Sequence, residues 1–291
     1  MTVESVAFIG LGAMGWRMAA HLPKHFPDVR VWNRTFDKAE KHATAFGTTA
    51  SSIEHAVQAD VIFSCLPTSA QVEEVILAYP PKAGSIWVDC TSGEPTSAQK
   101  LSQQLLDYDV HFLDAPVSGQ TIGAENGTLT VMVGGNAQAL ERARPAIEPF
   151  AGLIEHVGIS GSGFAVKAVN NMLLAVNLWA AAEGFSALKA HGVNIQSALN
   201  CINASSGKSN ATESVLPQRV FNRTFPNTFA LNLLAKDTGI ALDLVQRAKL
   251  PAPVLALTQS LIRAASDTSV ADSDFSAAVK LLESWTNIEL S

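Results

Sequence analysis

Cysteine is scarce in this sequence, which has three among 291 residues. Cys65, Cys90 and Cys201 stand far apart and form no closely spaced pair of the kind that holds a zinc ion. Thiols this few and scattered exclude a disulfide scaffold and fit a reducing compartment. We therefore expect a cytoplasmic protein without a metal site.

Basic charge is also in short supply: there are 20 Lys and Arg against 26 Asp and Glu residues, and the formal net charge is -6. Nucleic-acid binding needs a basic patch, so no nucleic-acid partner is expected. No apolar run approaches the roughly 18 to 20 residues that cross a bilayer, and the first residues lead into an apolar run without an export signal. With 47% hydrophobic and 16% charged residues, a globular protein without membrane contact is expected.

The length and the strand pattern predict an α/β domain followed by a second domain. From residue 1 to about 160, short β-branched runs alternate with amphipathic stretches, which is typical of parallel strands joined by crossover helices. The run 61–66 is apolar almost throughout, as expected of a strand covered on both faces. We predict a doubly wound parallel sheet over residues 1–161. Its strands are expected at 5–9, 29–32, 61–66, 86–89, 112–114 and 129–133.

After residue 161 strand signals are few and the apolar spacing becomes helical. The stretch 166–189 is rich in Ala and Leu and has no proline, which predicts one long helix. We predict an all-α domain over residues 162–291, joined through this helix. Further helices are expected at about 195–204, 228–248, 252–266 and 273–284.

A glycine turn, Gly10-Leu11-Gly12-Ala13-Met14-Gly15, follows the first strand. This spacing alone is a weak signal, but here an apolar strand precedes it and a stretch of helical spacing follows. Such a turn lets the backbone approach a pyrophosphate and points helix N-terminal amides at it. It predicts a Rossmann-type nicotinamide-dinucleotide site; the alternative is a tight turn without a ligand.

The end of the second strand reads Trp32-Asn33-Arg34-Thr35, where NAD-binding proteins usually place an acidic residue against the ribose 2′-hydroxyl. Nothing acidic stands there, so a 2′-phosphate would not be repelled. Arg34 can pair with that phosphate, and Asn33 and Thr35 can add neutral hydrogen bonds. The segment favours NADP over NAD, the alternative being that Arg34 is a solvated loop cation.

Hydride transfer also needs a proton donor or acceptor and a grip on the substrate. Ser118 and the Gly119 amide follow a predicted strand, where ligands of open sheets bind, and they can grip a carboxylate. Gly163, Lys167 and Asn171 recur every four residues and share a helix face. Burial among apolar residues would favour a neutral Lys167, as acid-base chemistry requires. The alternatives are a plain exit loop and a lysine that reaches out to solvent.

Four segments together resemble the β-hydroxyacid dehydrogenase family: Gly10 to Gly15, Asp114 to Gly119, Gly163 to Asn171, and Lys236-Asp237. The family includes 3-hydroxyisobutyrate dehydrogenase, tartronate semialdehyde reductase and the succinic semialdehyde/glyoxylate reductases. The resemblance covers nearly the whole chain. It implies reversible, nicotinamide-linked oxidation of a small β-hydroxy acid to its semialdehyde by a homodimer or homotetramer.

The resemblance also implies a role for each matching position. Lys167 matches the catalytic lysine, and Ser118, Gly119 and Asn171 match substrate-binding positions. The segment at Arg34 resembles the NADPH-using reductases of the family. The cofactor-binding positions implied by the turn, the second strand and the resemblance are Gly10, Leu11, Gly12, Ala13, Met14, Gly15, Asn33, Arg34, Thr35, Leu66, Pro67, Thr91 and Lys236.

Gln120 departs from the resemblance, because most members read Ser-Gly-Gly where this chain reads Ser118-Gly119-Gln120. The extra amide at this substrate-binding loop either recognises a polar substituent or narrows the pocket. Two other classes remain as alternatives: an enzyme like the imine reductases, which usually carry another residue in place of Lys167, and a non-catalytic dinucleotide-binding scaffold. The lysine argues against both.

Overall fold

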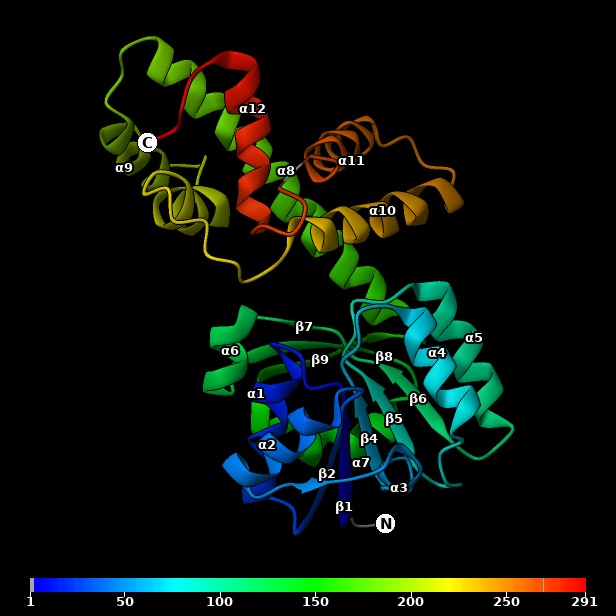
Figure 1. The fold of residues 1–291 in the computed structure, drawn as a ribbon. Helices are drawn as coiled ribbons and strands as arrows, with labels where there is room; N and C mark the ends of the chain where they lie inside the picture. The colour runs from blue at the N-terminus through cyan, green and yellow to red at the C-terminus, as the bar shows by residue number, and fades with distance from the viewer. Residues whose placement is uncertain (1–2, 269) are drawn as a thin grey trace. The chain divides into compact units, whose positions relative to one another are not determined.

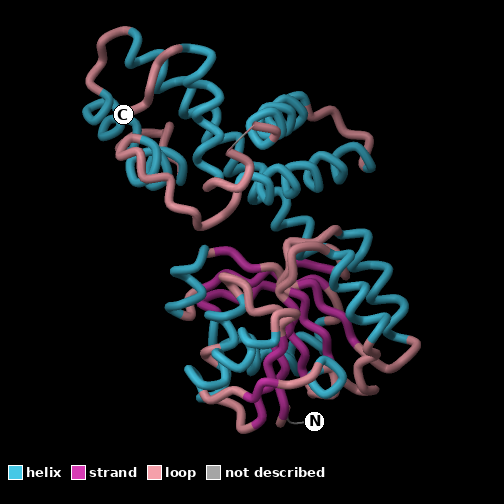
Figure 2. Tube along the Cα trace, in the orientation of Figure 1, coloured by secondary structure: helices cyan, strands magenta, loops and turns pink. Residues whose placement is uncertain are grey.

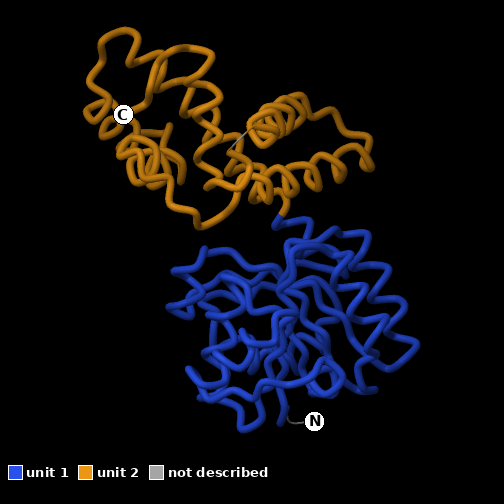
Figure 3. Tube along the Cα trace, in the orientation of Figure 1, with its two compact units in different colours: residues 1–167 blue, residues 168–291 orange. Residues whose placement is uncertain are grey.

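The computed structural model describes residues 3–268 and 270–291, and the chain divides into two compact units, residues 1–167 and 168–291 (Figure 3). The boundary expected at residues 161 and 162 coincides with the start of the long helix α8 (Ser162–Ala190). The first unit also takes in the first turns of α8. Lys167 is therefore the last residue of the first unit.

A single sheet organises the first unit, and within the described residues it has nine strands (Figure 1). Their order is β3-β2-β1-β4-β5-β6-β8-β7, with β9 paired to β8. The first six run parallel, and the chain winds from β1 outwards in both directions. The strands are β1 (Ser5–Ile9), β2 (Asp28–Trp32), β3 (Thr49–Ala50), β4 (Val61–Ser64), β5 (Ile86–Asp89), β6 (His111–Asp114), β7 (Val117–Ser118), β8 (Leu129–Gly134) and β9 (Ala151–Gly158).

The doubly wound sheet is confirmed, but it is mixed rather than parallel throughout. The sixth predicted strand, β8, runs antiparallel to β6 and β7. Three strands were not predicted. Two of them, β3 and β7, are two residues long, too short to show a period. The third, β9, is exposed or half-buried along its whole length, so its sequence lacks the apolar signal of a central strand.

Helices cover both faces of this sheet, which is why β1 is buried at every position. On one face Val6 and Phe8 pack with Met18 and Leu140, from helices α1 and α7. On the other face Trp87 and further strand residues pack with side chains of α3, α4 and α5. The helices of this unit are α1 (Gly15–Ala19), η1 (Leu22–Lys24), α2 (Phe36–Phe46), α3 (Ile53–Ala56), α4 (Ser69–Ala78), α5 (Pro95–Leu106), α6 (Gln120–Asn126), α7 (Ala137–Ile147) and η2 (Glu148–Phe150).

The described part of the second unit is helical, as predicted, and Figure 2 shows strands in the first unit alone. Its core gathers Trp179 and Phe185 of α8 with Leu216, Leu234 and Phe275 of later helices. The π-helix η3 was not predicted. The elements after α8 are α9 (Ile195–Asn203), η3 (Ala211–Val220), α10 (Leu231–Arg247), α11 (Pro253–Ser266), η4 (Phe275–Ala278) and α12 (Val279–Thr286).

Helix α8 spans 29 residues and begins four residues before the predicted start. By length and composition alone it is apolar enough to cross a membrane, as core helices of globular proteins also can be. Its side chains at Ala175, Leu178 and Ala182 belong to the hydrophobic core of the second unit. Because length and composition alone do not distinguish a core helix from a membrane span, the absence of membrane contact stays a prediction.

Candidate active site

Two of the three glycines in the turn after β1 are required by the packing of the protein itself. Gly10 has φ +97°, and a Cβ there would lie 2.5 Å from the Cys65 carbonyl oxygen. A Cβ on Gly15 would clash with the Gly10 carbonyl oxygen. Gly12 differs, because it is exposed and a Cβ there would meet no atom within 4 Å. The turn thus has an open face at Gly12, where a pyrophosphate can approach the backbone.

This difference gives a first testable prediction. Gly12→Ala is expected to keep its thermal unfolding temperature within about 3 °C of the parent, because no neighbour has to move. It should weaken NADPH binding roughly tenfold or more, equivalent to about 1.4 kcal/mol, by holding the pyrophosphate off the backbone. Gly15→Ala is the matched change that should lower stability. Fluorescence titration with NADPH and thermal unfolding measure both effects, and equal destabilisation by the two substitutions would contradict the assignment.

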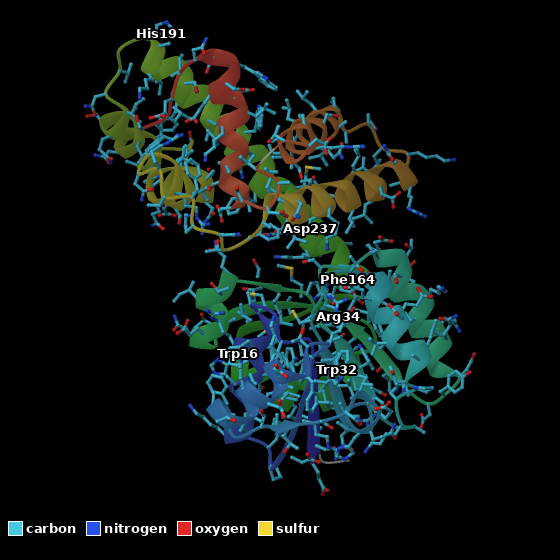
Figure 4. The ribbon with its side chains drawn as sticks, viewed as in Figure 1. Trp16, Trp32, Arg34, Phe164, His191 and Asp237 are labelled. Carbon is cyan, nitrogen blue, oxygen red and sulfur yellow. The ribbon has the colours of Figure 1, made fainter. Side chains whose placement is uncertain are left out.

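The loop after β2 braces the glycine turn. The Leu11 backbone N–H donates to Asn33 Oδ1 at 3.0 Å, and Asn33 Nδ2 donates to the Thr35 carbonyl oxygen at 3.1 Å. The sequence indicated Asn33 as a ligand of a 2′-phosphate, whereas in the structure its amide bonds within the protein. Arg34 and Thr35 are exposed, and Figure 4 shows Arg34 beyond Trp32, at the end of β2.

The loops after β4 and β5 are tied to each other, next to the point between β1 and β4 where the strand order reverses. Thr91 Oγ1 accepts from the Leu66 backbone N–H at 3.1 Å. Asp89 Oδ1 accepts from Ser64 Oγ at 2.9 Å and from the Thr91 N–H at 3.0 Å. Ligands of open α/β sheets bind at such reversal points. Leu66 and Thr91, two of the predicted cofactor-binding positions, are thereby held together, and the exposed Pro67 follows Leu66 directly.

Ser64 and Asp89 were not recognised from the sequence. Both are almost completely buried, and the Trp87 indole N–H also donates to Ser64 Oγ, at 2.8 Å. The signal that was available is a polar residue at the carboxyl end of an otherwise apolar strand.

Asp114, at the end of β6, anchors the start of α8. Its Oδ1 accepts from the Gly161 N–H at 2.7 Å and its Oδ2 from the Phe164 N–H at 3.0 Å. The carboxylate is fully buried, and burial raises the pKa of Asp114 to about 6, helped by the charge of Asp89 and opposed by the two N–H groups. The sequence placed Asp114 at the end of a predicted strand and at the start of the segment Asp114 to Gly119, and it did not reveal this contact.

The predicted substrate loop lies at the edge strand β7 and the first residues of α6. Ser118 is half-buried, and Gly119 and Gln120 are exposed. Gly119 has φ +133° and Gln120 has φ +59°. A residue other than glycine is uncommon in this left-handed region, so Gln120 occupies a strained position.

The second unit brings Asn171 and Lys236 to one carboxylate, that of Asp237. Asn171 is 3% exposed, and its Nδ2 donates to Asp237 Oδ2 at 2.6 Å. Lys236 Nζ lies 3.3 Å from Asp237 Oδ1. Lys167, which is half-buried, precedes Asn171 by four residues on α8 and so lies on the same helix face. Asn171 and Lys236 thus meet at Asp237 in the second unit, while the other predicted site residues, Lys167 included, belong to the first unit.

Comparisons with known proteins cover both units of the chain. Residues 5–158 match the model of the NAD binding domain of 6-phosphogluconate dehydrogenase, and residues 161–282 match the model described as NAD-binding of NADP-dependent 3-hydroxyisobutyrate dehydrogenase. The fold and the matched domains define an oxidoreductase that binds a nicotinamide dinucleotide. More narrowly, the chain belongs to the β-hydroxyacid dehydrogenase family.

Three relatives give the extent of this similarity. The NAD-dependent L-serine dehydrogenase of Pseudomonas aeruginosa is 36% identical over 97% of this chain and 98% of its own length. The 2-(hydroxymethyl)glutarate dehydrogenase of Eubacterium barkeri is 34% identical over 98% of this chain and 97% of its own. A structure of Mycobacterium tuberculosis 3-hydroxyisobutyrate dehydrogenase with L-serine has a TM-score of 0.88 and 32% identity, covering 97% of this chain and 99% of that chain.

Proposed function

We propose that this protein transfers a hydride between NADP(H) and a small β-hydroxy acid or its semialdehyde, with Lys167 as the general acid and base. The observation that carries the proposal is the arrangement on α8. A half-buried lysine stands one turn before an asparagine whose side chain is fixed by Asp237. A proton-transferring group and a rigid hydrogen-bonding group on one helix face are what reduction of a carbonyl requires.

The proposed roles follow the chemistry of each group. When an aldehyde is reduced, the Lys167 ammonium donates a proton to the carbonyl oxygen, and in alcohol oxidation the amine takes that proton back. The Ser118 hydroxyl and the Gly119 N–H bind the substrate carboxylate, and Asn171 orients the reacting group beside Lys167. A bound nicotinamide supplies or accepts the hydride. The open backbone at Gly12 fits the pyrophosphate of the dinucleotide, and the linked loops at Leu66 and Thr91 fit the ribose that carries the nicotinamide.

The NADP preference rests on Arg34. It is exposed just after β2, where the ribose 2′-position of a dinucleotide lies in this fold, and its neighbours Asn33 and Thr35 are not acidic. A guanidinium pairs with a phosphate through charge-assisted, bidentate hydrogen bonds. NADPH dependence in turn favours reduction of the semialdehyde.

The substrate class is supported by what the relatives are named for. L-serine and 3-hydroxyisobutyrate are both short carboxylic acids with a hydroxyl on the third carbon. We also expect a homodimer or homotetramer in the cytoplasm, which size-exclusion chromatography and cell fractionation would test.

A substrate panel tests the proposed function. Oxidation of NADPH is measured with short semialdehydes, and reduction of NADP with short β-hydroxy acids. Both are followed by the absorbance of NADPH at about 340 nm. Each assay is repeated with NADH or NAD. We expect turnover of at least one pair, with NADPH preferred. Turnover confined to imines, or no turnover with any compound, would overturn the proposal.

Gln120→Gly tests whether the unusual residue selects substrate. Glycine accepts φ +59° freely, so the variant should be more stable by about 1 kcal/mol, a rise of about 2 to 4 °C in the unfolding temperature. We expect kcat/KM to fall roughly tenfold for substrates with a polar substituent beside the carboxylate, equivalent to one lost hydrogen bond of about 1.4 kcal/mol, and to change little for unsubstituted ones. Unchanged selectivity would show that the Gln120 side chain does not bind the polar substituent. Faster turnover of bulky substrates by the variant would show that Gln120 narrows the pocket.

A further inference from the structure

The buried carboxylate of Asp114 holds the first turn of the helix that carries Lys167. Its two oxygens accept from two different backbone N–H groups, those of Gly161 and Phe164, which lie 47 and 50 residues further along the chain. N–H groups at the start of a helix have no partner within the helix, so this carboxylate caps α8 from another element. Lys167 follows Phe164 by three residues on the same helix.

The surrounding backbone is built closely around this contact. A Cβ on Gly163 would lie 2.5 Å from the Asp114 carbonyl oxygen, and a Cβ on Gly134 would lie 2.6 Å from Asp114 Oδ1. The Phe164 ring is 1% exposed and packs into the core of the sheet with Trp87. The carboxylate fixes the backbone at the start of α8, and the Phe164 ring fixes the rotation of α8 about its own axis.

An ionised carboxylate accepts at full strength at both oxygens, one for each N–H group. In a carboxylic acid the protonated oxygen becomes a donor and a much weaker acceptor, and in the amide of asparagine the nitrogen only donates. An acidic residue stands at position 114 although its carboxylate is buried. A second buried carboxylate, that of Asp89, is its register partner on β5. On the β8 side the neighbour is Gly134, which has no side chain.

We propose that Asp114 is a positioning residue for Lys167: its ionised carboxylate sets the first turn of α8, and loss of that charge lets Lys167 move away from the reacting carbonyl. This inference rests on the proposed role of Lys167. It assigns no contact between Asp114 and substrate or cofactor.

The positioning role predicts opposite responses of activity and stability to acid. Burial raises the pKa of Asp114 to about 6 from its ordinary value of 3.8, so Asp114 takes up a proton in the folded protein before it does so in the unfolded chain. Its contribution to the free energy of unfolding is therefore greatest below about pH 4 and falls as pH rises through 6. Turnover should behave in the other direction, falling as pH decreases through about 6.

Asp114→Asn provides the test, with Asp274→Asn as the matched control. Asp274 is also a fully buried carboxylate that caps a helix, since its Oδ1 accepts from the Ser276 N–H at 3.1 Å in the second unit; its Oδ2 in addition pairs with the buried Arg219, so its loss tests a larger destabilisation. We expect Asp114→Asn to lower kcat about 10- to 100-fold, the cost of a small misplacement of a catalytic group, with NADPH affinity unchanged. It should also remove the loss of turnover near pH 6. The control should lose thermal stability but keep kcat and its pH profile.

Thermal unfolding from pH 5 to 7 supplies the second half of the test. The stability of the parent relative to Asp114→Asn should rise as pH falls, while the ratio of their kcat values should fall. If parent and variant have the same kcat, and if their turnover falls in the same way below about pH 6, the positioning role would be overturned and the proposed function would stay intact.

A measurement independent of turnover covers the case in which Asp114→Asn does not fold or no substrate is turned over. Amide hydrogen exchange of residues 161–167 in the parent protein, corrected for intrinsic rates, should be faster at pH 5 than at pH 7 relative to the rest of α8. Equal protection at both values would overturn the proposal. Absence of turnover with every compound, by contrast, would count against the proposed function alone.

Discussion

Replacing Lys167 with alanine is expected to lower turnover at least about 100-fold, the loss that follows removal of a positioned general acid. The variant should fold and bind NADPH as the parent does, because the Leu11–Asn33 and Leu66–Thr91 hydrogen bonds and the open backbone at Gly12 are supplied by other residues. Steady-state kinetics with the best compound of the substrate panel, NADPH titration and thermal unfolding measure the three quantities.

Two further measurements separate proton transfer from charge at this position. Lys167→Arg keeps a cation but cannot give up its proton near neutral pH, so it should be nearly as inactive as Lys167→Ala. A small primary amine added to Lys167→Ala should restore part of the turnover. Near-normal turnover of Lys167→Arg would show that a positive charge suffices and would contradict proton transfer, and near-normal turnover of Lys167→Ala would remove Lys167 from the mechanism.

Arg34→Ala is expected to weaken NADPH binding about 10- to 100-fold, because charge-assisted hydrogen bonds to a phosphate are worth about 1.5 to 3 kcal/mol. NADH lacks the 2′-phosphate, so its affinity should change less than about twofold, which amounts to about 0.4 kcal/mol. Dissociation constants from fluorescence titration give both values. Lys24→Ala is the control for a general loss of positive charge, since Lys24 is exposed and precedes β2 instead of following it. Equal losses for NADPH and NADH would contradict the NADP assignment.

The parts of the fold that the sequence predicts well are those with a strong local signal. The fully buried strands β1, β4 and β5 are short apolar runs, and α8 is a long stretch without proline. The two-residue strands have no such signal, and β9 lies against β8 without becoming buried. The π-helix η3 was not predicted, because it contains Pro217, and a proline within a sequence normally indicates that a helix ends before it.

The candidate site shows the same limit. The glycine turn, Lys167 and Asn171 are recognisable because spacing along the chain reveals them. The contacts that hold them are not local: Leu11 bonds to Asn33 across 22 residues, Asp114 reaches Phe164 across 50, and Asn171 reaches Asp237 across 66. Side chains that link distant segments leave no period in the sequence, so the contacts of Asp114 and Ser64 emerge only from the folded structure.

Transfer of a labelled hydride tests the central claim most directly. The parent protein would be given NADPH with deuterium in place of both hydrogens at C4 of the nicotinamide, together with the semialdehyde that it reduces fastest, and the product would be examined by mass spectrometry. The account predicts a hydroxy acid that carries one deuterium on the carbon bearing the new hydroxyl, formed at least about 100-fold more slowly by Lys167→Ala. Product without deuterium, or the same labelled product formed at the same rate by Lys167→Ala, would contradict it.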